Sequence, residues 1–433
     1  MIHASTSPMA NSALGQNLLV ARQYAAVVTA FTLPFSTSGQ AIAVSVLAVL
    51  AVLTLDRPRL AATLRSPAAY LPLLLVGFVL LGVMWSIAPF GPALKGVGPY
   101  SKLLLIPLLM GCAFTPKHAV QIGCGFVASC VVLLALSYAS MLWPSGPWGW
   151  FKGPGIPVKD NAVQSECFAL CAFGLAMGAI RTLRQGQRRP AIFMFLLAAL
   201  FFANIFMIFL SKTGMLVAAA VLALFLFEVG GWKRILSIGV AALLLIALAL
   251  WTSAPAQRRI AEMSIDMKAG NGVSETVSTA SRLDFWNKAA GFVKQAPLLG
   301  HGTGSIQPLY QTLEATRPSP YGQAVSDPHN QFLHTTLQIG MLGGLVLLAM
   351  WAVHVRLFLG RDMASMVALA VIVQNLIGSL FNSHISQVTQ GMTYCLAVGI
   401  LGAVVLGLRS PQLRLGAQPD AAPTPPLLAA TQP

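Results

Sequence analysis

Charged side chains are scarce in this sequence. Only 9% of its 433 residues are Asp, Glu, Lys or Arg, and just 12 of these are acidic. So little charge excludes an ordinary soluble domain, in which about 25% of residues are charged. The chain is instead 56% hydrophobic, with a mean hydropathy of +0.74. It is therefore expected to be an integral membrane protein.

The sequence also lacks the patterns that hold metal ions. Divalent cations need several converging carboxylates, but there is no Asp-x-Asp pair, and the acidic residues on the expected outer side are scattered. No Cys-x-x-Cys occurs, and all six cysteines fall inside apolar runs, which excludes a disulfide framework in the outer loops. No metal and no cofactor are expected.

The apolar runs lack the alternating ten-residue pattern of a membrane β-barrel, which leaves a helical bundle. About twelve runs approach the length of roughly 20 residues that a helix needs to cross a hydrocarbon core. The first and fourth are short and contain Pro34 and Pro107, which kink or shorten helices. The expected fold is an all-α bundle with these spans: Gln23–Phe35, Gln40–Leu55, Tyr70–Ile87, Ser101–Phe114, Val120–Trp143, Ala162–Ile180, Ala191–Leu210, Met215–Glu228, Ile235–Trp251, Asn330–Val353, Ala364–Phe381 and Gln390–Leu408.

The positive residues are unevenly distributed between the two sides. With the N-terminus inside, fifteen of the 27 Lys and Arg residues face the cytoplasm, five lie in short outer loops or helix edges, and seven lie in one long outer segment. Because basic residues concentrate in cytoplasmic loops, both termini are predicted to be cytoplasmic. Residues 1–22 lack the features of a cleavable signal, so the first helix is expected to direct insertion. Topology also explains most of the net charge of +15, and no nucleic-acid motif is present.

One long connection divides the chain. Residues 1–251 are predicted to hold the first nine spanning helices, 252–328 to form a large periplasmic loop, 329–408 to hold the last three spans, and 409–433 to be a disordered cytoplasmic tail. The loop is expected to contain short helices, because apolar positions recur at helical spacing over residues 282–293. A glycine-rich turn follows at residues 297–305.

The last spans begin with DPHNQFLHTTLQIGMLGG. Asp327 is predicted to cap a helix whose first residue is Pro328. His329 then shares a face with Leu333, Thr336 and Gly340, where small residues admit another helix. The helix dipole disfavours a charged imidazole and attracts anions, so His329 could be a neutral base beside a phosphate. The alternative, that His329 and His334 only lie in the interfacial zone, remains open at this stage.

The spacing His-Asn, nine residues, Gly, two residues, Gly resembles the signature of the O-antigen ligase family. It is met by His329, Asn330, Gly340 and Gly343. Ser281-Arg282 with Trp286, followed by Pro297, Gly300, Gly302 and Gly304, is similar to the family's Arg-Trp helix and Pro-x-x-Gly-x-Gly turn. O-antigen polymerases and protein O-oligosaccharyltransferases share much of this pattern, so both remain as alternatives.

The resemblance implies a GT-C-like glycosyltransferase of the bacterial inner membrane with its active site facing the periplasm. The implied reaction is a metal-independent, inverting transfer of O-antigen polysaccharide from undecaprenyl diphosphate to lipid A-core. The family's catalytic histidine falls on His329, and its loop arginine on Arg282. A further family arginine falls on Lys212, which keeps the charge but loses the bidentate fork.

Such a transfer needs a base for the attacking hydroxyl and cations for the departing diphosphate. Arg282, Lys212, Arg258 and Arg259 are the candidates for that cationic cradle. Each has an alternative as an interface anchor that extends to the headgroups. Asn330 and His301 are further candidates for contact with substrate.

Other polar residues have simpler interpretations. The outer loop of residues 144–161 carries Trp150, Lys152 and Lys159, which are expected to form an aromatic belt with neighbouring basic residues. Polar residues near the eleventh span either line a cavity or form hydrogen bonds between helices: Gln374, Asn375, Asn382 and His384.

A secondary transporter is the alternative from another class, because twelve spans with both termini inside is also a transporter layout. Transporters usually show half-chain repeats and ionisable groups at the membrane centre. No convincing repeat is visible, and the distinctive polar groups gather at the outer edge. The sequence therefore favours the glycosyltransferase.

Overall fold

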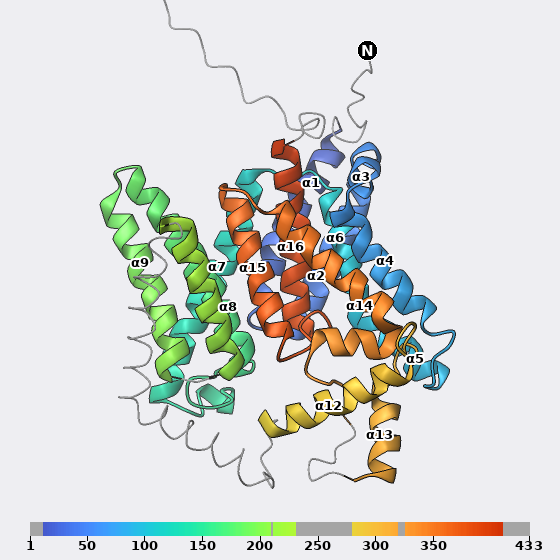
Figure 1. Cartoon of the computed structure of the whole chain (residues 1–433). Coiled ribbons are helices and arrows are strands. Elements are labelled where there is room, and N and C mark those ends of the chain that lie inside the picture. Colours follow the sequence, from blue (N-terminus) through green and yellow to red (C-terminus); the bar gives the residue numbers. More distant parts are fainter. Residues whose placement is uncertain (1–11, 209–210, 231–278, 319–324, 410–433) are drawn as a thin grey trace, which may run out of the picture.

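The computed structural model describes residues 12–208, 211–230, 279–318 and 325–409 (Figure 1). These residues form helices, turns and bends, with a single isolated bridge between Gly153 and Ile156 and no strand. The expected all-α architecture is confirmed for this part of the chain. Within it, six helices are long and apolar enough to cross a membrane, or seven if the bent pair α2 and α3 is one span. The chain is thus a multi-pass membrane protein, as expected.

The described helices follow the apolar runs of the sequence. Their bounds are α1 Ala13–Thr32, α2 Thr37–Leu53, α3 Arg57–Leu64, α4 Pro67–Leu81, α5 Phe90–Ser101, α6 Leu105–Met110, α7 Pro116–Leu142, α8 Asn161–Arg184, α9 Arg188–Ala203, Lys212–Gly230, α12 Thr279–Gln295, α13 Ile306–Thr316, α14 Gln331–Leu357, α15 Met363–Ser379 and α16 Val388–Arg409. Every predicted span overlaps a helix except Ile235–Trp251, which lies outside the described residues.

Polar side chains begin many of these helices. Ser12, Ser36, Thr115 and Asp160 each accept a hydrogen bond from the backbone N–H three residues later, which satisfies one of the free amides of a first turn. The fourth predicted span is not one helix. It is split between α5, a 3₁₀ turn and α6, which contains Pro107, a residue that cannot donate a helix hydrogen bond.

The helices bury three groups of apolar side chains. The largest joins α2, α4, α6, α14 and α16, and the second joins α7, α8 and α9. The third joins α12 and α13 to the first turns of α14 through residues such as Phe285, Tyr310 and Leu337. Figure 1 shows α12 and α13 at the end of the bundle opposite the start of α1. The helices α12 and α13 are therefore packed onto the helix that follows His329.

The glycine-rich turn is inserted into a break in α14. At Ile339 and Gly340 the backbone leaves the helical conformation, and Gly340 has φ 68°. The carbonyl of Leu337, left without a helical partner, accepts from the amide of His301 at 2.9 Å, and the amide of Met341 donates to Pro297 at 2.8 Å. Backbone groups freed by the kink are thus satisfied by the turn, as buried amides and carbonyls require.

This joint corrects the prediction that Gly340 and its neighbours admit another helix. A Cβ at Gly340 would lie 1.9 Å from the Leu298 carbonyl oxygen, so Gly340 admits the 297–305 turn. A Cβ at Gly343 would meet the side chain of Ile339 in the same helix at 2.3 Å. The turn's Gly300 also fits closely, because a Cβ there would lie 2.6 Å from the carbonyl carbon of Gln338. Gly300 and Gly340 therefore serve a turn-to-helix joint.

Candidate active site

His329 lies in the backbone segment just before α14. The prediction that Asp327 caps this helix, with Pro328 as its first residue, is wrong. Asn330 is the N-cap, since its Oδ1 accepts from the amide of Leu333 at 3.0 Å. The Asp327 carboxylate instead accepts from the amide of His329 at 2.9 Å, a local turn that aspartate favours.

As a result, His329 does not continue the helical face of Leu333 and Thr336. Its φ is +55°, and it is the single non-glycine residue with a positive φ in the described part of the chain. Such a conformation costs free energy and persists only where neighbouring groups enforce it. The hydrogen bond from the His329 amide to Asp327 supports it here.

The His329 ring meets Asn382, which follows α15. Nδ1 of His329 lies 3.1 Å from Oδ1 of Asn382. An amide oxygen only accepts, so in the neutral ring Nδ1 carries the hydrogen and Nε2 keeps its lone pair. The ring also stacks on Phe285 of α12, with centroids 6.3 Å apart and planes 28° apart. The imidazole is thereby held in one orientation and one tautomer, with Nε2 available as a proton acceptor.

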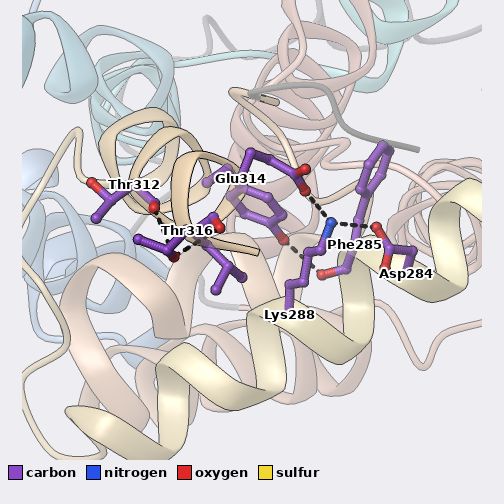
Figure 2. Close-up of polar contacts among 8 residues, drawn as sticks. Asp284, Phe285, Lys288, Thr312, Glu314 and Thr316 are labelled. Atoms are coloured by element: carbon purple, nitrogen blue, oxygen red, sulfur yellow. Dashed lines mark hydrogen bonds and ion pairs between the residues drawn. The ribbon is translucent and has the colours of Figure 1, made fainter. Parts of the chain in front are cut away.

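The packing of α12 against α13 fixes the position of Phe285. Figure 2 shows Lys288 between two carboxylates, those of Asp284 on α12 and Glu314 on α13. Burial acts to lower the pKa of Lys288, but its hydrogen bonds with Asp284 and Glu314 outweigh burial and the pKa is raised. The Tyr310 hydroxyl donates to the carbonyl of Phe285 at 2.6 Å. The two helices therefore form a rigid support for the ring beside His329.

Arg282 lies on α12, three residues before Phe285. Its side chain is half-buried, and its Nε has no hydrogen-bond partner among the described residues. Burial lowers the pKa of Arg282, and the charge of Asp327 acts in the opposite direction. Asp327 also accepts from the hydroxyl of Ser383 at 2.5 Å. The Asp327 carboxylate thus interacts with Arg282, with the amide of His329 and with Ser383, which follows Asn382.

A cavity of about 550 Å³ is lined in part by Asn382, but not by His329 or Arg282. The first residues of α2, α8 and α16 line it, together with Lys152 and Lys159 from the loop before α8. Lys159 is only 9% exposed and donates to the Leu33 carbonyl and the Thr389 hydroxyl, both at 2.7 Å. Burial lowers the pKa of Lys159. Asp160 also lines the cavity, but its carboxylate caps α8, and the two lysines with the helix N-termini favour an anionic group in this space.

The other predicted site residues lie elsewhere. Asn330 uses its amide for the N-cap and donates to the Leu380 carbonyl at 3.1 Å. The Nε2 of His301 lies 2.9 Å from the Phe292 carbonyl, so this ring is engaged with α12. Lys212 is exposed at the start of its helix and does not line the cavity. Arg258 and Arg259 lie outside the described residues.

Asn382, Lys152 and Lys159 were not predicted as site residues. Asn382 was noted as polar, but the sequence could not tell a cavity from an interhelical hydrogen bond; in the structure it serves both purposes. Lys159 was expected in an interfacial belt, whereas it is buried against Leu33 and Thr389. Over the described ranges, no three His, Cys, Asp or Glu side chains gather as metal ligands.

Residues 196–348 match a family model described as O-antigen ligase. The matched segment contains Lys212, Arg282, the 297–305 turn and His329, and it ends within α14. No curated protein sequence matches the chain. The predicted resemblance to the O-antigen ligase family is therefore confirmed, on the segment that carries the signature.

Proposed function

We propose that this chain, which carries the O-antigen ligase family domain over residues 196–348, transfers O-antigen polysaccharide from undecaprenyl diphosphate to lipid A-core. The transfer is inverting, uses no metal and takes place at the periplasmic face of the bacterial inner membrane. The sugar acceptor and the lipid-linked donor are its two substrates.

The observation that carries this proposal is the contact between His329 and Asn382, because Asn382 also lines the cavity. With Nδ1 donating to Asn382, Nε2 accepts the proton of the acceptor hydroxyl as that oxygen attacks the anomeric carbon of the donor. The new glycosidic bond forms while the bond from the anomeric carbon to the diphosphate oxygen breaks. The lipid diphosphate leaves with the bonding electron pair, and the proton remains on His329.

The departing diphosphate gains negative charge, which fixed cations stabilise. Lys152 and Lys159 line the cavity, and Arg282 lies near Asp327, so we assign diphosphate binding to these three. Lys212, Arg258 and Arg259 remain candidates for the same role. Asn330 and His301 are instead assigned to holding the backbone around the site, because their polar atoms are engaged there.

The proposed topology has about twelve spans in a GT-C-like arrangement with both termini in the cytoplasm. Residues 1–251 and 329–408 hold the spans, residues 252–328 form the periplasmic loop, and residues 409–433 form the cytoplasmic tail. In support, α12 and α13 lie at the end of the bundle opposite the start of α1 (Figure 1). This arrangement supports placing the site and the start of α1 on opposite sides of the membrane.

The proposal is tested with purified protein, lipid-linked O-antigen and rough lipopolysaccharide, in the absence of nucleotide and metal. Ligation gives a ladder of capped lipopolysaccharide on a gel. Growth of the lipid-linked polymer alone would indicate a polymerase, and glycosylation of an added protein acceptor would indicate an oligosaccharyltransferase. A protein that is folded by its thermal transition but makes none of these products would overturn the proposal.

A further inference from the structure

A buried polar cluster lies between α8 and α15, away from His329. Glu166 of α8 is 2% exposed, and its Oε2 accepts from Nε2 of Gln374 on α15 at 3.0 Å. Its other oxygen, Oε1, lies 3.2 Å from Nε2 of His384, which is fully buried. Ionisable side chains inside a helical bundle are costly and are retained where they have a role. The proposed mechanism assigns no role to Glu166 or His384.

The position of the His384 ring is tightly restricted. A Cβ added to Gly378 would lie 1.6 Å from Cε1 of His384, so the ring rests directly on the backbone of α15. Glu166 then faces the ring nitrogen from α8. One helix supplies the surface and the other supplies the carboxylate, and the His384 ring lies between them.

His384 belongs to the connection between α15 and α16, which also carries Asn382 and Ser383. Asn382 contacts the His329 ring, and Ser383 donates to Asp327. The far side of this connection is held by Lys102, whose Nζ donates to the Gln387 carbonyl at 2.6 Å. The connection therefore reaches the site through residues one and two positions before His384.

We propose that Glu166 and His384 are positioning residues that set the Asn382 amide against the His329 ring. This inference rests on the proposed function, because it concerns the orientation of the proposed base. A shift of the connection would move Oδ1 of Asn382 away from Nδ1 of His329 and release the other tautomer, whose Nε2 carries a hydrogen and accepts no proton. Misplacement of a reacting group by about 1 Å can slow a reaction on the order of 100-fold.

The test variant is Glu166→Gln, which can still accept from Gln374 but presents no carboxylate to His384. We expect kcat of ligation to fall about tenfold, with the KM of either substrate unchanged. The matched control is Tyr394→Phe, which removes the equally buried contact of its hydroxyl with His354 and is expected to leave kcat unchanged. A fall in kcat of equal size in the control would overturn the proposal, since the loss would then reflect general destabilisation.

A double variant separates positioning from any other effect of Glu166. In an Asn382→Ala background the substitution Glu166→Gln should have no further effect on kcat, because the amide that it positions is absent. Additive losses would overturn the proposal.

A second measurement needs no activity and so separates this inference from the proposed function. In protein labelled with ¹⁵N-histidine, the His329 signal is identified by its loss in His329→Asn. We expect hydrogen on Nδ1 in the wild type and a mixture of tautomers in Glu166→Gln. An unchanged tautomer in Glu166→Gln would overturn the positioning role, whether or not the protein ligates. Absence of all transferase activity with the expected tautomers would overturn the proposed function alone.

Discussion

The substitution Asn382→Ala tests the site most informatively, because it removes one contact and leaves the proposed base in place. It deletes the acceptor that lies 3.1 Å from Nδ1 of His329. In the transition state the imidazole becomes charged, and a hydrogen bond to a charged group contributes roughly 1.5–3 kcal/mol. Since about 1.4 kcal/mol corresponds to a factor of ten in rate, kcat is expected to fall about 10- to 100-fold.

The assay measures initial rates of capped lipopolysaccharide formation with purified protein and saturating donor. The KM values should change less than kcat, because Asn382 stabilises charge that forms during the reaction. Asn382→Asp is the matched control, since its carboxylate still accepts from Nδ1 and should retain most of the activity. If Asn382→Ala retained the wild-type kcat, or if both variants lost activity equally, the assigned role of the amide would be refuted.

Three further predictions concern the joint, the support and the cavity. Gly340→Ala should clearly lower the thermal transition temperature, because its Cβ would lie 1.9 Å from the Leu298 oxygen at a φ of 68°. Gly174→Ala should leave this temperature unchanged, because a Cβ there meets nothing within 4 Å. Equal effects of the two substitutions would contradict the close contact between Gly340 and the turn. The pKa of Lys288 is raised from 10.5 by its carboxylate partners, so its ion pairs should stabilise the fold below about pH 10.5 and lose this effect as pH rises through the higher folded-state pKa. The thermal transition temperatures of wild type and Lys288→Met should therefore converge at high pH. A difference that stays constant with pH would refute the contribution of the ion pairs. In initial-rate kinetics, Lys159→Ala should raise the KM for the lipid diphosphate donor about tenfold, whereas the control Lys117→Ala should leave it unchanged. An unchanged donor KM in Lys159→Ala would exclude Lys159 from diphosphate binding.

The positions of most helices could be predicted because their signals are local. Each apolar run lies within the helix that it predicts. A polar cap such as Ser36 or Asp160 lies next to the first turn of its helix. The start of α14 was predicted wrongly because Asp327, Pro328 and Asn330 are all residues that begin helices. The choice among them depends on Asp327, whose carboxylate bonds to His329 and to Ser383, 56 residues later.

The site was predictable only in part, because some of its contacts join residues that are far apart in the sequence. His329 and Arg282 could be identified by their motifs, and the structure brings both to Asp327. Asn382 lies 53 residues after His329, and Lys159 lies 170 residues before His329. The roles of Asn382 and Lys159 therefore arise from helix packing. Likewise, the spacing of Gly340 could be read, but its partner at Leu298 is set by the fold of the outer segment.

The most direct test of the central claim is complementation of a strain that lacks its own O-antigen ligase, comparing wild type with His329→Asn. Asparagine tolerates the positive φ of this position but supplies no base, so the variant should reach the membrane in normal amounts. The wild type is predicted to restore capped lipopolysaccharide on a gel, and the variant is predicted to restore none. Capping by His329→Asn at the wild-type level would contradict the account.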